Sequence, residues 1–277
     1  MTTTETGNAL ASENCHWYDK DGTPRYSVIG KNGKERPTNI KDAKENGWLP
    51  SVTNILNVAA KPGLQKWKLQ QMLHAALTLP RIEGETDDAF AERVIEDSEA
   101  QSKKAAEKGT ELHAAIEQYI QETAAISEWD DHILAVTSEL LQYGIDLKDG
   151  KAEHSFASPL GFGGKLDWHD DNVLIDFKTK NEIIEGKQLA WPEHCWQLAA
   201  YANGLSHEQI DNTPLINLPV LSRRIINVFV GVSDRKVRIH EWSQEDAERG
   251  WDAFLYLLNF WQITKNFGRY SKNRAKP

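Results

Sequence analysis

The chain has little cysteine and no long run of apolar residues. Its two cysteines, Cys15 and Cys195, lie far apart in 277 residues. They are too few for a disulfide framework, a four-thiolate zinc site or an iron–sulfur cluster within one chain. No apolar run approaches the ~18 residues that a membrane-spanning helix needs. The first residues, MTTTETGNALASEN, also lack the basic and apolar regions of a secretory signal. We therefore expect a cytoplasmic protein with reduced thiols and no membrane partner.

Positive charge is also in the minority. The chain has 32 Lys and Arg against 41 Asp and Glu, which gives a formal net charge of −9. This balance excludes a simple basic coat for nucleic acid, but it does not exclude DNA binding, because the distribution of charge matters more than its sum. Residues 266–277 carry four basic side chains and no acid. We expect a basic C-terminal tail there, which either contacts phosphates or is simply solvated.

The pattern of apolar residues predicts helices first and then strands. Helical spacing covers 64–77, 87–125 and 130–143, with a break or bend near Gly109 in the second segment. This order favours an α/β or α+β fold with a small mixed central sheet flanked by helices. The later segments alternate in type: we expect strands at 153–157, 165–168 and 173–178, a helix at 192–203, a hairpin of 224–230 with 236–240, and a helix over 243–265.

The N-terminal part reads as an elaboration on this core. Two turn signals, Asp21-Gly22 and Asn32-Gly33, predict a short β-ribbon, and Ser51 is a candidate helix N-cap. We see no convincing linker. The predicted organisation is a disordered N-terminus at 1–15, a β-ribbon and helical elaboration at 16–104, a core at 105–265 and the tail at 266–277.

One pair of predicted strands carries a candidate site. The first strand ends at Asp167, and the second contains Ile175-Asp-Phe-Lys178. Because strand side chains alternate, Asp176 and Lys178 point the same way. If the strands form a hairpin, Asp167 approaches Asp176, and two neighbouring carboxylates favour a divalent cation such as Mg²⁺ or Mn²⁺. An isolated Asp-x-Lys is more often the polar face of a hairpin. Here a Gly-rich turn precedes the first aspartate, and Gly163 and Gly164 would let backbone or DNA approach closely.

Four motifs together resemble the PD-(D/E)XK nuclease superfamily, and within it the RecB-like exonuclease branch. They cover roughly residues 105–205, and each is weak alone while the ordered set is specific. The resemblance implies a restriction-endonuclease-like core. The four motifs are Gly109-Thr-Glu-Leu-His113-Ala-Ala-Ile-Glu117, Gly164-Lys-Leu-Asp167, Asp176-Phe-Lys178-Thr and Gln197-Leu-Ala-Ala-Tyr201.

The resemblance implies a Mg²⁺- or Mn²⁺-dependent DNA exonuclease acting on linear ends in recombination or repair. Such proteins occur in bacterial or phage-infected cells, where a recombination or single-strand-binding protein is a natural partner. The chain has no phosphate-binding motif of a helicase motor. The implied catalytic residues are Asp167, Asp176 and Lys178; the implied metal ligands are His113, Asp167, Asp176 and Phe177; and the implied supporting or DNA-binding residues are Glu117, Glu153, Gln197, Tyr201 and Lys180.

Other interpretations stay open. The motifs do not separate an exonuclease from a structure-specific endonuclease on the same fold, and a non-catalytic DNA-binding module would keep the same architecture. His113 and Glu117 are one helical turn apart, so they could be an ordinary ion-paired face. Gln197 and Tyr201 could likewise be a helix edge that packs on the sheet.

Overall fold

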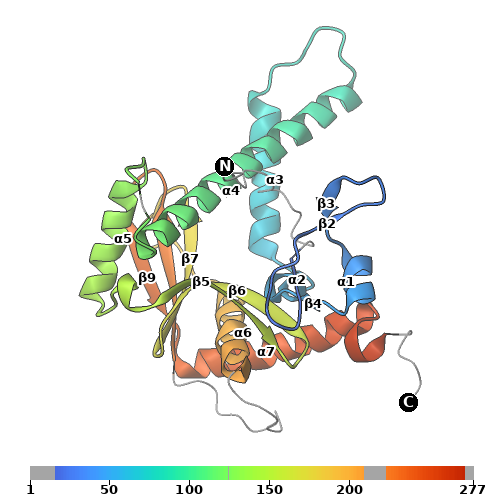
Figure 1. The fold of residues 1–277 in the computed structure, drawn as a ribbon. Helices are drawn as coiled ribbons and strands as arrows, with labels where there is room; N and C mark the ends of the chain where they lie inside the picture. Colours follow the sequence, from blue (N-terminus) through green and yellow to red (C-terminus); the bar gives the residue numbers. More distant parts are fainter. Residues whose placement is uncertain (1–15, 124, 209–222, 272–277) are drawn as a thin grey trace. The chain divides into compact units, whose positions relative to one another are not determined.

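The computed structural model describes residues 16–123, 125–208 and 223–271 (Figure 1). These residues form a mixed α+β fold with a five-stranded sheet and seven helices, at 49% helix and 21% strand. The predicted fold class is therefore confirmed. The predictions for 1–15 and for the tail beyond Ser271 lie outside the described residues. No helix in the described part of the chain is both long and apolar enough to cross a membrane.

The central sheet has the strand order β5-β6-β7-β8-β9. Strand β6 is antiparallel to both β5 and β7, β7 and β8 are parallel, and β8 and β9 are again antiparallel. Parallel neighbours need a crossover, and helix α6 (Pro192–Glu208) lies in the connection from β7 to β8. The strands are β5 (Lys151–Ser158), β6 (Phe162–His169), β7 (Val173–Lys180), β8 (Arg224–Gly231) and β9 (Val237–Glu241).

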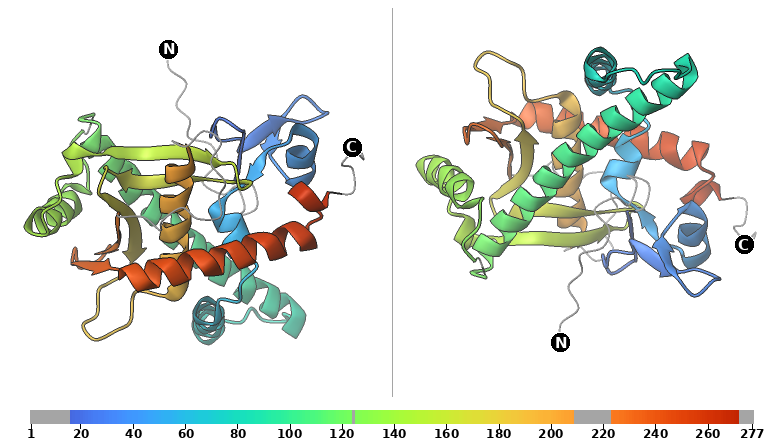
Figure 2. Two further views of the ribbon diagram at one scale, coloured as in Figure 1. Left: turned by 90° about the horizontal axis from the view of Figure 1, so that it is seen from below. Right: turned by 90° about the horizontal axis from the view of Figure 1, so that it is seen from above.

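Two helices build the core against β6 and β7. Buried Leu198 of α6 and Phe254 and Leu258 of α7 (Gln244–Thr264) share one apolar cluster with Leu166 and Leu174 of these strands. Figure 2 shows α6 and α7 on the same side of the sheet. Helix α5 (Asp130–Gln142) contacts β8 and β9. The sheet is thus flanked by helices as the sequence predicts.

The N-terminal ribbon is present and packs with this core. Strands β2 (Ser27–Ile29) and β3 (Glu35–Pro37) pair around Asn32-Gly33, while β1 (Trp17–Tyr18) pairs with β4 (Leu49–Pro50). Ser51 caps α2 (Val52–Leu56) by accepting the Asn54 N–H at 3.0 Å, as expected. Helix α1 (Ile40–Asn46) lies between β3 and β4. Trp17 stacks on Phe267 at 5.7 Å between ring centroids, which ties the ribbon to the C-terminal end of the core.

The chain divides into two compact units that differ from the predicted boundaries. One comprises Met1–Val58 with His113–Pro277, and the other is Ala59–Leu112. The ribbon belongs to the first unit because its aromatic side chains are buried there. The second contains α3 (Pro62–Thr78) and most of α4 (Asp87–Ile120). In it, the Arg93 guanidinium pairs with Glu85 at 2.6 Å.

Two local expectations from glycine are wrong. Helix α4 does not break near Gly109 but continues through this buried residue, because the gain from packing exceeds the ~1 kcal/mol propensity cost of glycine. It ends at Ile120 because Glu122 takes a left-handed φ of 56° and the Thr123 N–H bonds back to the Gln118 carbonyl.

The other glycine expectation concerned the turn before Asp167. Gly163 and Gly164 lie inside β6, not in a turn. What approaches them is protein: a Cβ on Gly163 would lie 2.8 Å from the Tyr18 side chain, and one on Gly164 would lie 2.8 Å from Tyr201. These glycines therefore let aromatic rings pack on the strand.

Candidate active site

The two aspartates lie where strands β6 and β7 separate. Only two residue pairs join these strands, His169 with Leu174 and Trp168 with Ile175. At the next position, the Asp167 carboxylate accepts the Phe177 main-chain N–H at 2.7 Å. A side chain thus takes the donor that a regular ladder would give to the neighbouring backbone. The result is a fork with Asp167 on one arm and Asp176 on the other.

The ladder is also interrupted on the other side of Asp167. Ala152 pairs with Trp168 and His154 pairs with Leu166, but the intervening Glu153 does not pair, and it adopts a left-handed φ of 56°. Such a conformation is unfavourable for a residue with a Cβ and is common at functional sites. The Glu153 carboxylate forms an ion pair with Lys165. Burial raises the pKa of Glu153, against the opposing effect of Lys165.

Asp176 is nearly enclosed, with 3% of its surface exposed. Lys178 Nζ lies 3.0 Å from Asp176 Oδ1 and 2.8 Å from Oδ2, and Asn227 Nδ2 donates to Oδ2 at 2.7 Å. Burial raises the pKa of Asp176, and the nearby charge of Asp167 raises it further, while Lys178 acts in the opposite direction. The carboxylate is fully hydrogen-bonded, yet its burial still disfavours its charge.

Lys178 connects this carboxylate to helix α6. Its ammonium also donates to Gln197 Oε1 at 3.1 Å, and Gln197 Nε2 donates to Tyr201 Oη at 3.0 Å. Burial lowers the pKa of Lys178, but Asp176 and Asp167 outweigh burial and raise it overall. Lys178 therefore stays an ammonium at neutral pH. The sequence pattern Gln-x-x-x-Tyr thus reaches the strand motif through a chain of hydrogen bonds.

His113 approaches the other aspartate from helix α4. Its Nδ1 lies 3.5 Å from Asp167 Oδ2, and its ring meets the Phe177 ring edge-on at 6.2 Å between centroids. Burial lowers the pKa of His113, but Asp167 outweighs burial and raises it overall. Burial pushes the pKa of Asp167 upward, and His113, Lys178 and the Phe177 N–H together bring it below its usual value. The two groups form a charge-stabilised pair.

Two predicted supporting residues lie at the margin of this cluster. Glu117 accepts a hydrogen bond from Gln121 at 2.9 Å, and its charge acts on Glu153 and Lys165. Lys180 holds its ammonium 5.9 Å from the centre of the Phe229 ring. Burial and the nearby charge of Lys178 lower its pKa. Neither is hydrogen-bonded to Asp167 or Asp176 among the described residues.

The sequence pattern missed Asn227 and Trp242. Trp242 Nε1 donates to Asn227 Oδ1 at 2.8 Å, which leaves the NH₂ of this amide for Asp176. Asn227 is fully buried at 0% exposure. Its signal in the sequence is a single polar residue inside the apolar run Ile225–Val230. A buried amide in such a strand calls for a polar partner.

The N-terminal ribbon forms a further wall of the site. A cavity of about 350 Å³ opens on the aspartates and Lys178, and Tyr18 and Tyr26 line it with their hydroxyl oxygens 3.3 Å apart. Ser51 and Thr53 add two more hydroxyls to the lining. The sequence did not predict that any of these four residues lines the site, because the segment that contains them carries none of the four motifs.

The donor set fits a hard divalent cation in chemistry. Two carboxylates and an imidazole suit Mg²⁺ or Mn²⁺, and Phe177 could contribute only its main-chain carbonyl. In the described part of the chain, no three His, Cys, Asp or Glu side chains are already grouped around a cation position. Lys178 accounts for this, because its ammonium occupies the position of a counter-charge at both Asp176 oxygens. A cation at Asp176 requires Lys178 to release one oxygen.

Comparisons with known proteins add little to this geometry. No family model and no curated protein sequence matches the chain. Among solved structures, it is similar to one titled "Crystal structure of SSO0001", with 16% identity over 70% of this chain and 86% of that chain. The TM-score of 0.28 is too low to support a conclusion about the fold or activity of this chain.

Proposed function

We propose that the protein is a metal-dependent DNA exonuclease that hydrolyses phosphodiester bonds at linear ends. The observation that carries this proposal is the cluster of buried Asp176 with the partly buried Asp167 and Lys178, which opens on a cavity beside His113. The motif resemblance supports the same chemistry, with end resection for recombination or repair as its purpose.

Each residue has a role in this proposal. Asp167, Asp176, His113 and the Phe177 carbonyl would hold Mg²⁺ or Mn²⁺, which when bound neutralises phosphate charge and lowers the pKa of water. Lys178 is cationic, so it stabilises negative charge that develops on the phosphate rather than removing a proton. Gln197 keeps the ammonium of Lys178 in place, and Tyr201 keeps Gln197 in place.

Two alternative functions can be tested by the same experiment. A structure-specific endonuclease would use the same residues, since the cluster is not specific for strand ends. A non-catalytic DNA-binding module is disfavoured because the residues of all four motifs are retained and hydrogen-bonded or ion-paired with one another.

The test uses end-labelled linear duplex and closed circular DNA of the same sequence, with Mg²⁺, Mn²⁺ or EDTA. We expect loss of the linear substrate only, and full inhibition by EDTA. Asp176→Asn should abolish cleavage. Lys178→Ala should lower the rate by on the order of 10²–10³, the usual effect of removing one transition-state donor. Lys236→Ala, which removes a lysine on the surface paired with Asp234, is the control.

The same variants separate binding from chemistry. Because Lys178 competes for the oxygens of Asp176, Lys178→Ala should bind Mn²⁺ in a calorimetric titration at least as tightly as the parent. Equal cleavage of circular DNA would favour the endonuclease. Full cleavage in EDTA, or by Asp176→Asn, would show that this cluster is not the active site.

A further inference from the structure

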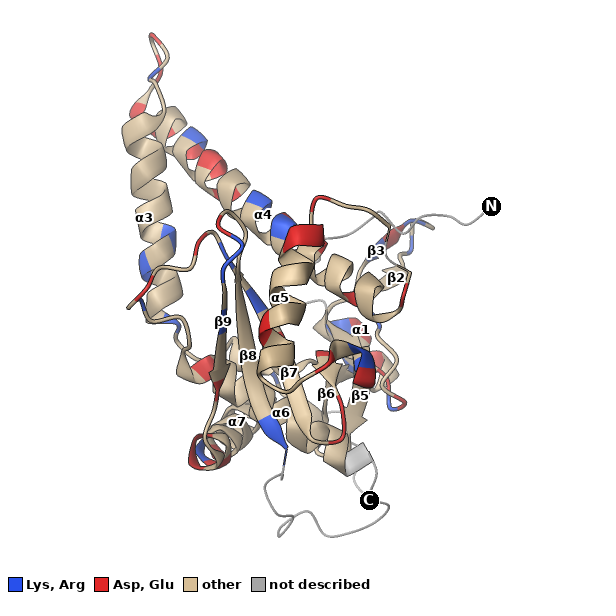
Figure 3. Ribbon diagram, turned by 90° about the vertical axis from the view of Figure 1, so that its left-hand side faces the viewer, with Lys and Arg blue, Asp and Glu red and all other residues tan. Residues whose placement is uncertain are grey.

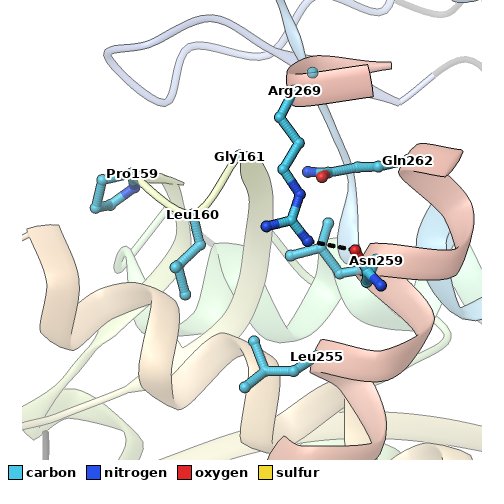
Figure 4. Close-up of a pocket in the computed structure, with 9 residues that line it drawn as sticks. Pro159, Leu160, Gly161, Leu255, Asn259, Gln262 and Arg269 are labelled. Carbon is cyan, nitrogen blue, oxygen red and sulfur yellow. Dashed lines mark hydrogen bonds between the residues drawn. The ribbon is translucent and has the colours of Figure 1, made fainter. Parts of the chain in front are cut away.

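A second cavity, unrelated to the aspartates, lies at the other end of the β5–β6 hairpin. Its volume is about 460 Å³. The turn at Pro159, Leu160 and Gly161 forms one side, and helix α7 with the short 3₁₀ helix η2 (Gly268–Tyr270) forms the other (Figure 4). This volume is in the usual range for sites that bind small groups.

Gln262 supplies an unusual polar group to this cavity. The residue is 7% exposed, and no described residue forms a hydrogen bond with its side-chain amide. The amide is not one of the fully enclosed polar atoms that lack a partner, and it lines the cavity. Its donors and its acceptor are therefore open to a ligand there. Gly161 at φ 94° keeps the space around it open, because a Cβ there would lie 3.3 Å from Gln262 Nε2.

Arg269 supplies a positive charge beside this amide. One guanidinium nitrogen donates to Asn259 Oδ1, and the group lies 5.0 Å from the Tyr270 ring centre. Tyr270 Oη also donates to the same Asn259 oxygen, at 3.0 Å. No ion pair with an acidic side chain involves Arg269 within the described ranges. The other N–H groups of its guanidinium are therefore available to an anion.

The rest of the lining is apolar. Leu160, Leu255 and Leu258 face the same cavity, and Figure 4 shows Leu160 and Leu255 on either side of the space below Arg269. An apolar floor under one cation and one amide selects a ligand with an apolar body and an anionic end. A bare phosphate would satisfy the cation but leave the leucines in water.

We propose that this cavity binds the C-terminal residue of a partner protein, with an apolar side chain next to a free carboxylate. The carboxylate takes N–H donors from Arg269 and from the Gln262 NH₂. The main-chain N–H of the same residue donates to Gln262 Oε1, and its side chain packs on the leucines. The Gln262 amide can donate to the carboxylate and accept from the main-chain N–H of the same residue. A fatty acid has a carboxylate but no such N–H, so this amide favours a peptide end.

A partner with acidic residues before its apolar C-terminal residue would also complement the charge of Arg269.

The proposal is tested by fluorescence anisotropy with a labelled peptide that ends in Gly-Ser-Gly-Phe with a free carboxylate. Three further probes carry a C-terminal amide, alanine in place of phenylalanine, or proline in place of phenylalanine. We expect binding of the first probe and at least tenfold weaker binding of the other three. Arg269→Gln and Gln262→Leu should each weaken the first probe at least tenfold, since each removes donors to an anion.

Arg249→Gln is the matched control. It removes an arginine of helix α7 that is paired with Glu245 and Asp246, so the affinity should not change. Leu255 is half-buried and lines the cavity. Leu255→Phe should therefore fill part of the cavity and weaken binding of the first probe, although Arg269 is still present. This second variant keeps the test valid if Gln262→Leu does not fold.

Several results would overturn the proposal. They are no binding of the first probe at millimolar concentration, equal binding of the amide, or equal loss of affinity in Arg249→Gln. Tenfold tighter binding after deletion of residues 272–277 would assign the cavity to the chain's own end instead.

Discussion

Asn227 is the residue that connects the proposed metal site to the rest of the sheet. Its amide is fully buried between two partners, with Trp242 donating to its oxygen and its nitrogen donating to Asp176. Because Lys178 must leave one oxygen of Asp176 when a cation binds, Asn227 is the donor that remains. The Asn227 amide therefore sets the orientation of the carboxylate.

Asn227→Leu should weaken metal binding and shift the pH dependence of activity. Without the amide donor the pKa of Asp176, already raised by burial, rises further, so the carboxylate protonates at a higher pH. The acid limb of the pH–rate profile should move upward, and Mn²⁺ affinity at neutral pH should fall by about 10–100-fold, as for other residues that orient metal ligands. Calorimetric titration and initial rates across pH measure both effects.

Asn203→Leu is the control for this prediction. Asn203 is also a buried amide, but it donates to the Ala199 carbonyl at 2.8 Å and does not contact Asp176. It should lower stability without moving the acid limb. If both variants shift the profile equally, Asn227 has only a structural role.

From the spacing of residues alone, the candidate site was predictable only where its residues are close along the chain, and His113, Gln197 and Tyr201 came from the motif resemblance. The spacing of Asp176 and Lys178 fixes a shared face of one strand, and the hairpin brings Asp167 near. Asn227 reaches Asp176 through the parallel pairing of β7 with β8, whose register forms after a long crossover. Local patterns carry no information on such a register, so Asn227 could not be placed from the sequence.

Among the single elements, helix α1 contains a carboxylate, that of Asp42, which belongs both to the N-terminal cap and to an ion pair. Asn39 accepts the Asp42 N–H at 3.2 Å, and Asp42 accepts the Asn39 N–H at 2.9 Å, which is a complete capping box. Arg36 on β3 donates to both oxygens of Asp42, each at 2.7 Å. The Arg36 hydrogen bonds, and then the Asn39 N–H, lower the pKa of Asp42 against the effect of burial.

Asp42→Asn should therefore cost stability at neutral pH and little in acid. The folded pKa lies below the unfolded value near 3.8, so the stabilisation is complete above the unfolded pKa. It is lost as pH falls through the folded pKa. We expect a loss of about 1–2 kcal/mol at pH 7, measured by urea unfolding.

The pH dependence distinguishes this from a packing defect. The difference between the parent and Asp42→Asn should close as the pH falls below the folded pKa of Asp42, because Asp42 is then protonated in both states of the parent. Glu45→Gln removes an exposed charge 4.0 Å from Lys41 and should change stability very little. If the difference in the free energy of unfolding between the parent and Asp42→Asn persists unchanged at low pH, the Asp42 carboxylate is not the source of this stabilisation.

Caps and turns were among the elements that the sequence predicted well. The Asn32-Gly33 turn and the Ser51 cap depend on neighbouring residues alone. The course of α4 through Gly109 depends on what the helix packs against, and a glycine in isolation predicts the opposite. Caps and turns are set by interactions between residues close in sequence, whereas the course of α4 is set by packing between residues far apart in sequence.

At the scale of the whole molecule, the net charge of −9 opposes DNA binding. Acidic and basic side chains are interspersed along α4, with more acidic than basic residues (Figure 3). Arginines near the β8–β9 hairpin are already engaged: Arg235 pairs with Asp131 at 2.9 Å, and Arg238 donates to the Lys187 and Ile184 carbonyls. Lys180 continues the strand that carries Lys178 and makes no ion pair with an acidic side chain in the described ranges.

Lys180→Gln should lower DNA affinity and its dependence on salt. If its ammonium contacts one phosphate, the slope of log affinity against log salt should become shallower by about 0.9 for duplex DNA. Lys236→Gln should leave the slope unchanged, because Lys236 is paired with Asp234 at 3.4 Å. Anisotropy of labelled duplex, with Ca²⁺ in place of Mg²⁺ to prevent cleavage, gives both slopes. Equal slopes in parent and Lys180→Gln would place the DNA elsewhere.

The fork at Asp167 interrupts the regular pairing of the sheet at the place where the proposed active site lies. Asp167 keeps β6 and β7 apart by taking the Phe177 N–H, and Glu153 keeps a conformation that a regular strand would avoid. A side chain at position 167 that cannot accept a hydrogen bond removes the reason for this gap, and the two strands are then free to pair further. In the proposed function, the fork gives up regular pairing in order to keep the two carboxylates where a cation would bind, as is common where a site and folding stability make opposite demands.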